Sequence, residues 1–115
     1  MNKNNFSRYN DGIIALYRET ERRTNFEAKI NVSALDDLQF IVKLAFEQSA
    51  KRQQDLEFAE QLGFSLSLKV KTRLVKGIDN KCKAVIDGFL YDVSYIDTSR
   101  NEMWLYLEQV KEIDK

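Results

Sequence analysis

Apolar and polar positions alternate along much of the chain, which is the pattern of strands that bury one face. The clearest case is residues 66–74, where Leu, Val and Thr alternate with Ser, Lys and Arg. Residues 26–32 alternate in the same way, and the β-branched and aromatic run 13–17 is typical of a short strand. The pattern therefore predicts three strands in the first two thirds of the chain.

The last third of the chain predicts two hairpins. Asp87-Gly88 lies between two short apolar runs, and Asp-Gly favours a two-residue hairpin turn because both central residues need a positive φ. The apolar run 89–96 is expected to pair with 103–110 across the polar loop 97–102. We expect residues 75–83, which precede the first hairpin, to form a loop.

Between the early and late strands the pattern favours a helix. Ser33 followed by Asp36 resembles a capping box, and apolar residues then recur at helical spacing. We predict a helix over 34–50 within a helical insertion of about 34–62, with Gly63 in a helix-stop position. The rival interpretation is a strand, because apolar side chains also recur at every second position: Leu38, Phe40, Val42, Leu44 and Phe46.

These elements predict a mainly β fold with one helical insertion (α+β), arranged as a small antiparallel β-barrel or sandwich. The chain of 115 residues fits one domain. We place a flexible tail at 1–10, the β-rich domain at 11–110 and a frayed end at 111–115.

The composition fits an ordinary globular protein. Lys plus Arg equals Asp plus Glu at 18 each, so the net charge is zero and no strongly basic nucleic-acid binder is indicated. The lone Cys82 excludes an internal disulfide, which favours a reducing compartment. The sequence has neither an apolar stretch of membrane-spanning length nor an apolar segment of the signal-peptide kind near its start, so we expect an intracellular protein with no membrane partner.

Few residues suggest catalysis. The sequence contains no His, the commonest acid/base group and metal ligand near neutral pH. The acidic pair Asp36-Asp37 suits a helix N-terminus, and the acids of 55–60 are interpreted as solvated or capping. Cys82 lies between Lys81 and Lys83, which could lower its pKa, but no second Cys or His accompanies it, so the favoured interpretation is an incidental loop or sheet cysteine. We therefore predict a protein that is not an enzyme and that uses no metal or cofactor.

A row of basic side chains is the most informative polar feature. Lys69, Lys71 and Arg73 alternate along a predicted strand, so they share one face at a spacing of about 6.6 Å. The plain interpretation is a solvated face that protects a sheet edge. The functional interpretation is a surface that meets phosphates weakly and in a salt-sensitive way.

Aromatic residues gather in the two hairpins. Alternation places Phe89, Tyr91 and Tyr95 on one face, and Trp104 with Tyr106 on one face of the next strand. Apolar residues therefore occur on both sides of a thin sheet. Such a surplus suits a subunit that buries part of its surface against neighbours.

Four segments resemble the head-closure proteins of tailed bacteriophages, also called head–tail adaptors, joining proteins or stoppers. The likeness spans about residues 11–110 and is carried by Arg52-Gln53-Gln54-Asp55-Leu56-Glu57-Phe58-Ala59-Glu60, Leu66-Ser67-Leu68-Lys69-Val70-Lys71-Thr72-Arg73, Val85-Ile86-Asp87-Gly88-Phe89-Leu90-Tyr91-Asp92-Val93 and Met103-Trp104-Leu105-Tyr106-Leu107-Glu108.

The resemblance implies a role in assembly. Members of this family form a ring below the portal and its adaptor, retain packaged DNA and present a docking surface for the tail. They are monomeric until they meet the connector, so the expected location is the virion head–tail junction, after assembly in the cytoplasm of a bacterial host or from a prophage. The row Lys69, Lys71 and Arg73 is then a candidate DNA-channel or subunit-interface surface. The insertion residues Arg52, Asp55, Glu57 and Glu60 are candidates for assembly contacts.

Two alternatives stay open at this point. One is a tail-completion or tail-terminator protein, since such proteins share small β-rich folds. The other is a small nucleic-acid-binding β-barrel, in which the basic row meets phosphates and an aromatic such as Tyr91 stacks on bases.

Overall fold

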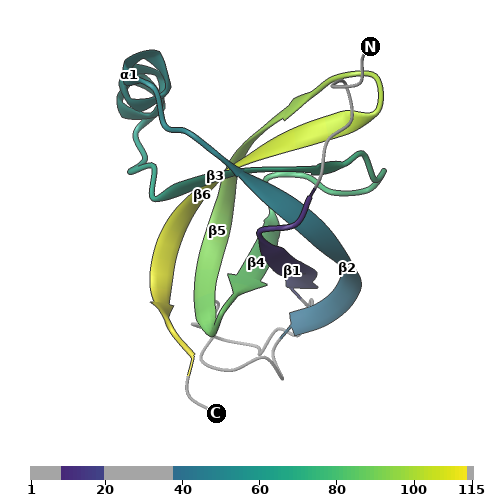
Figure 1. The fold of residues 1–115 in the computed structure, drawn as a ribbon. Coiled ribbons are helices and arrows are strands. Elements are labelled where there is room, and N and C mark those ends of the chain that lie inside the picture. The colour runs from purple at the N-terminus through teal and green to yellow at the C-terminus, as the bar shows by residue number, and fades with distance from the viewer. Residues whose placement is uncertain (1–8, 20–37, 114–115) are drawn as a thin grey trace.

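Six antiparallel strands close into a barrel, and one helix packs on its outer side (Figure 1). The computed structural model describes residues 9–19 and 38–113. The elements are β1 (Gly12–Glu19), β2 (Leu38–Ser49), α1 (Gln53–Leu62), β3 (Leu68–Arg73), β4 (Cys82–Ile86), β5 (Phe89–Thr98) and β6 (Glu102–Glu112). Around the barrel the strands follow the order β1-β2-β3-β6-β5-β4. The predicted fold class, mainly β with one helical insertion in a small antiparallel barrel, is confirmed.

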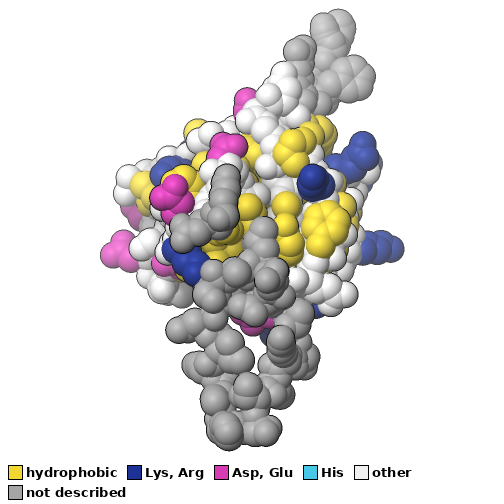
Figure 2. All heavy atoms as spheres, turned by 90° about the horizontal axis from the view of Figure 1, so that it is seen from below, with side chains coloured by type: hydrophobic (Ala, Val, Ile, Leu, Met, Phe, Trp, Pro, Cys, Tyr) yellow, Lys and Arg dark blue, Asp and Glu magenta, His cyan; other side chains and the backbone are white. Residues whose placement is uncertain are grey.

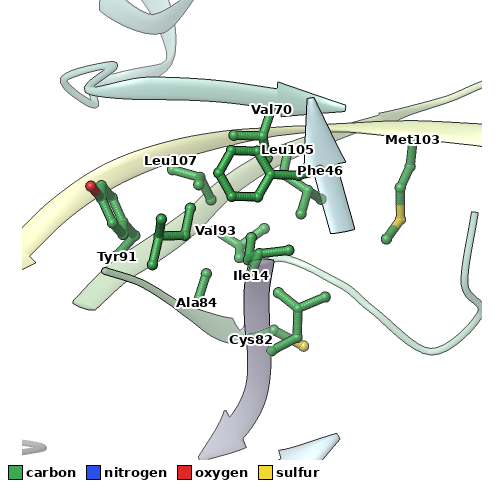
Figure 3. Packing of buried hydrophobic residues seen from close by; sticks show 12 residues of the cluster. Ile14, Phe46, Val70, Cys82, Ala84, Tyr91, Val93, Met103, Leu105 and Leu107 are labelled. Carbon is green, nitrogen blue, oxygen red and sulfur yellow. The ribbon is translucent and has the colours of Figure 1, made fainter. Parts of the chain in front are cut away.

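The core fills the inside of the barrel with apolar side chains from every strand (Figure 3). The alternation of each strand sends every second residue inward, as a closed barrel requires. Each strand contributes at least one fully or nearly fully buried residue: Ile14, Phe46, Val70, Ala84, Val93 and Leu105. The barrel is therefore packed by its own side chains.

The helix predicted over 34–50 is wrong, because residues 38–49 form strand β2. This strand pairs with β1 along its length, so Val42 and Leu44 face the core opposite Leu16 and Ile14. The helical part of the insertion is confined to α1, which ends at Gly63 as predicted. Gly63 has a φ of 85°, a left-handed conformation that glycine adopts without strain.

Both predicted hairpins are present, with small corrections at their ends. The Asp87-Gly88 turn has a positive φ at both residues and joins β4 to β5. β5 and β6 pair as expected, but their ladder is longer than predicted and runs from Phe89 paired with Glu112 to Thr98 paired with Met103. Residues 75–83 are a loop only as far as Lys81, because β4 begins at Cys82.

The predicted chain ends need one correction. Lys111 and Glu112 belong to β6 instead of a frayed end, because they pair with Leu90 and Phe89 of β5. Tyr9, within the predicted tail, donates a hydrogen bond of 2.6 Å from its hydroxyl to Glu102 Oε2. The strand predicted at 26–32 and the helix start predicted at Ser33, Asp36 and Asp37 lie outside the described residues.

Candidate interaction surfaces

The outer side of β5 and β6 forms one of two surfaces on which function can be built, and α1 covers part of it. Phe58 of α1 packs edge-on against Tyr95 and Tyr106, with ring centroids 4.7 and 6.0 Å apart. Ala59 is buried against the same cluster, which also includes Trp104. Much of the apolar surplus outside the barrel is thus covered by the protein's own helix.

The expected sharing of one face by Phe89, Tyr91 and Tyr95 is wrong. Tyr91 lies in the barrel core, whereas Tyr95 lies outside beneath α1. The ladder of β5 and β6 shifts between Val93 and Tyr95, and this irregularity reverses the alternation. Trp104 and Tyr106 do share the outer face, as predicted.

A buried acid fixes α1 to the barrel. Asp55 Oδ2 lies 3.1 Å from the Lys69 ammonium and accepts the backbone N–H of Arg52 at 3.0 Å, and the Tyr106 hydroxyl lies 3.4 Å from Oδ1. Burial alone raises the pKa of Asp55, but the hydrogen bonds from Arg52 and Lys69 outweigh it and the pKa lies below its ordinary value. Burial also raises the pKa of the Tyr106 hydroxyl. Asp55 is therefore an ionised anchor between helix and sheet.

The predicted basic row lies on the outer face of β3, but two of its three charges are matched by acids. Lys69 pairs with Asp55, and its ammonium lies 5.1 Å from the centre of the Tyr106 ring. The Lys71 ammonium lies 3.5 Å from a Glu47 carboxylate oxygen and 3.9 Å from a Glu102 carboxylate oxygen. Arg73 is the member of the row that is exposed. Lys69 and Lys71 therefore form ion pairs with acids of α1, β2 and β6, and Arg73 is the exposed base at the end of the row.

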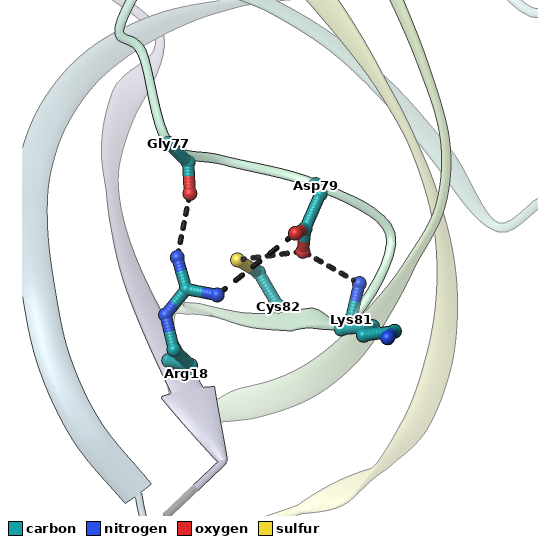
Figure 4. A network of polar contacts seen from close by, with 5 residues as sticks. All are labelled: Arg18, Gly77, Asp79, Lys81 and Cys82. Atoms are coloured by element: carbon teal, nitrogen blue, oxygen red, sulfur yellow. Dashed lines mark hydrogen bonds and ion pairs between the residues drawn. The ribbon is translucent and has the colours of Figure 1, made fainter.

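Further cations lie on the loop that leads from β3 to β4. Arg18 donates to the Gly77 carbonyl at 2.6 Å and lies 3.9 Å from Asp79, which holds this loop over the end of β1 (Figure 4). Asp79 also accepts the backbone N–H of Lys81 at 3.0 Å, and this hydrogen bond is the main reason that its pKa is lowered. The exposed bases of this loop and of the nearby β5–β6 turn are Arg73, Lys76, Lys81 and Arg100.

Cys82 does not have the reactive environment that its lysine neighbours suggested. Its side chain is buried in the core, and burial raises the pKa of the thiol. Lys83 points outward, where it pairs with Asp92 and Glu19. Cys82 is a core residue of β4.

The second candidate surface is the outer wall of β1 and β2. Ile14 and Leu16 face the core, so Ile13, Ala15 and Tyr17 face outward. The ladder places Tyr17 beside Phe40, and their rings make an edge contact at 5.7 Å. We define the β1–β2 wall by its outward residues, which are Ile13, Ala15, Tyr17, Phe40, Lys43 and Ala45.

Large apolar side chains on this wall are about half exposed. Ile13 is 54% and Phe40 52% exposed, and the basic Lys43 lies between them on the ladder. Figure 2 shows one face of the molecule on which hydrophobic side chains lie next to Lys and Arg. The sequence did not reveal the wall because the helix predicted over 34–50 includes Phe40 and Lys43. Alternation alone would also have placed Phe40 on the core face with Val42 and Leu44, since the shift in the ladder next to Tyr17 is what turns Phe40 outward.

The predicted insertion residues Arg52, Asp55, Glu57 and Glu60 fall at the start of α1 or within it. Asp55 points to the barrel, whereas Glu57 and Glu60 are exposed. Glu57 accepts a hydrogen bond from the Gln53 side chain at 3.2 Å. The four residues therefore divide into the inward anchor Asp55, the exposed base Arg52 at the helix start and the two outward acids.

The described residues offer little to chemistry. They contain no group of three or more His, Cys, Asp or Glu side chains that could hold a metal ion. An open cleft of about 300 Å³ lies at the start of α1, lined by Arg52, Lys69, Asp97 and Trp104 among others. Its charges balance, since it brings together two bases and one acid while Lys69 is already paired.

Comparisons with known proteins add no family. No protein-family model matches the chain, and no curated protein matches it. Among the described helices, none has the length and apolar character needed to cross a membrane. The fold and the two outer surfaces of the barrel are therefore the features on which a function can be proposed.

Proposed function

We propose that this protein is a subunit of a bacteriophage head–tail connector, in the position of a head-closure ring. The observation that carries the proposal is the half-exposed Ile13 and Phe40 on the wall of a barrel whose core is already filled. A closed barrel needs no further apolar cover, so such side chains are best explained by a partner. The family resemblance also implies a small β-barrel with a long insertion, and the barrel with α1 between β2 and β3 fits that fold.

A closed barrel suits a ring subunit for a second reason. Each described strand already pairs with two neighbours, so none of them is an edge strand that is free along one whole side. Contacts between copies then form through side chains. Such contacts can be specific, and they can be weak enough to form only on the portal–adaptor complex. We expect the isolated chain to be monomeric and to form a ring on the portal–adaptor complex, with packaged DNA passing nearby.

The direct test is the location of the chain in virions of the phage or prophage that encodes it. Cryo-electron microscopy of the connector is expected to show a ring of barrels between adaptor and tail. A knockout is expected to yield filled heads that lose DNA and lack tails. Virions whose junction lacks this chain would contradict the proposal.

A tail-completion protein is the alternative that the same apolar wall supports, because it too assembles by contact between subunits. The two positions differ in their first partner. A pull-down with the purified portal-side adaptor and, separately, with tail tube protein distinguishes them. Capture by the adaptor supports head closure, and capture by the tail tube alone supports tail completion.

A further inference from the structure

The two candidate surfaces lie on opposite sides of the barrel. From β1 to β6 the closed order runs through β2 and β3 in one direction and through β4 and β5 in the other. Both paths cross two strands, so β6 is the strand across the barrel from β1. Since α1 packs over Tyr106 of β6, the helix and the β1–β2 wall face away from each other (Figure 1).

The exposed part of α1 is acidic and partly apolar. Leu56 is 40% and Leu62 54% exposed, and Glu57 and Glu60 lie among the exposed residues between them. The helix has no Lys or Arg, and its third acid, Asp55, is already paired with Lys69. At about 100° per residue, Leu56, Glu57 and Glu60 share one side of the helix, whereas Leu62 lies on the side of Asp55 and Ala59. The outward face of α1 therefore offers one leucine and two acids to solvent.

The β1–β2 wall has the complementary character. Ile13 and Phe40 are the exposed apolar residues, and Lys43 has no ion pair with any described residue. The acids of these two strands are occupied, because Glu19 pairs with Lys83 and Glu47 with Lys71. The wall is thus apolar with an unmatched positive charge.

We infer that the exposed face of α1 in one copy docks on the β1–β2 wall of the next copy. The inference deepens the proposed function, on which it rests for the need to assemble at all. Two different patches that meet each other make a head-to-tail contact, which closes into a ring when the rotation between copies allows it. The patches cannot meet within one chain, because they lie on opposite sides of the barrel.

Cysteine cross-linking between two separately purified variants tests the contact directly. Leu56→Cys places a thiol on the outward face of α1, and Phe40→Cys places one on the wall, while the buried Cys82 stays unreactive. A short bis-maleimide added to the mixture after assembly on the portal–adaptor complex is expected to join the two variants faster than either joins itself. Val110→Cys is the matched control, because Val110 is also apolar and 48% exposed but belongs to neither patch.

Charge reversal provides the second arm. Lys43→Glu is expected to slow the cross-link about fivefold or more, because like charges then face each other. Glu57→Lys with Glu60→Lys in the other variant is expected to restore the rate. Equal rates for the control pair, or no restoration by the second reversal, would overturn the inference.

The outcomes separate this inference from the proposed function. Cross-linking with restoration, in a chain that is absent from the virion junction, would leave the contact intact and refute the connector role. A chain found at the junction whose variants fail to cross-link at these positions would keep the connector role and refute this interface.

Discussion

Asp55 is the single residue on which the position of α1 depends most. It joins the backbone at the helix start, Lys69 of β3 and Tyr106 of β6 through one carboxylate. Buried ion pairs often add little net stability, but removal of one partner leaves the other charge buried and unmatched. The network is therefore best tested by changes to its acid.

We predict that Asp55→Asn lowers the free energy of unfolding by about 1–3 kcal/mol. The amide keeps the shape but loses the charge that Lys69 faces at 3.1 Å. Urea unfolding followed by circular dichroism measures the change, with Glu60→Gln, an exposed acid of the same helix, as the control. Equal effects of the two substitutions would contradict the anchoring role.

The same acid predicts a pH dependence. The pKa of Asp55 is lower in the folded protein than its ordinary value, so the unfolded chain binds a proton more readily. Its contribution is fully present above about pH 4, the ordinary pKa range of Asp, and is lost as the pH falls through the folded pKa. Unfolding between pH 2 and 7 should show a smaller acid-side loss for Asp55→Asn than for the unchanged chain.

Cys82 is predicted to be inert while the protein is folded. Its side chain is 1% exposed and burial raises the pKa of the thiol, so both access and thiolate formation are suppressed. Reaction with Ellman's reagent at pH 8 is expected to be roughly 100-fold slower in the folded protein than in urea, because it requires opening of the barrel. A rapid reaction of the folded chain would contradict this prediction and indicate that Lys81 and Lys83 activate the thiol.

At the scale of elements, Gly63 sets the end of α1. Its φ of 85° is left-handed, and no atom lies within 4 Å of the position that an added Cβ would occupy. The cost of Gly63→Ala is therefore purely conformational, at about 1 kcal/mol. Gly63→Asn should cost less, since Asn tolerates this conformation better.

Thermal unfolding of both Gly63 variants checks this prediction. Gln61→Ala, an exposed change within the same helix, is the control and should leave stability almost unchanged. If Gly63→Ala were as stable as the unchanged chain, the helix end would have to adopt another conformation.

The elements that sequence reasoning predicted well carry strong local signals. Asp87-Gly88 fixes a turn by its own backbone preferences, and Gly63 ends a helix in the same way. β2 carried no such signal, since its apolar residues fit both a helix and a strand. What decides for the strand is non-local: β1 is paired with β2 on one side and β4 on the other, and the barrel cannot close without this ladder.

The sequence also could not predict which side chains become partners in the folded protein. The row Lys69, Lys71 and Arg73 was predicted to share a face, and it does, but its acids come from α1, β2 and β6. A shift in the ladder at Tyr95 could not be read from alternation either. Local patterns predict which way a residue points, whereas tertiary pairing determines what it meets.

At the scale of the whole molecule, several exposed bases gather at the loop end of the barrel, where the β3–β4 loop and the β5–β6 turn lie. Arg73, Lys76, Lys81 and Arg100 are exposed there, and Asp79 nearby is held by Arg18 and the backbone of Lys81. If packaged DNA passes this end in the assembled connector, these bases meet its phosphates. Contacts of this kind are weak, independent of base sequence and sensitive to salt.

We predict that the protein binds duplex DNA only weakly, with a Kd on the order of 10⁻⁴ M at physiological salt. Replacement of Arg73, Lys76 and Arg100 by Gln should reduce the slope of log K against log salt concentration by about 2–3. The reason is that fewer phosphate contacts form, so binding releases fewer counterions. Fluorescence anisotropy with a labelled duplex at low salt measures this slope.

The matched control removes the same number of charges elsewhere. Replacement of Lys43, Lys51 and Lys111 by Gln changes the net charge equally but leaves the loop end intact. This control should change the slope by less than about 1.

Lys69→Gln and Lys71→Gln should alter the free energy of unfolding more than the salt slope of DNA binding, because acids already neutralise both bases. Equal slopes for the two triple variants would mean that DNA binding depends on net charge alone, and would contradict the prediction that the bases at the loop end contact DNA.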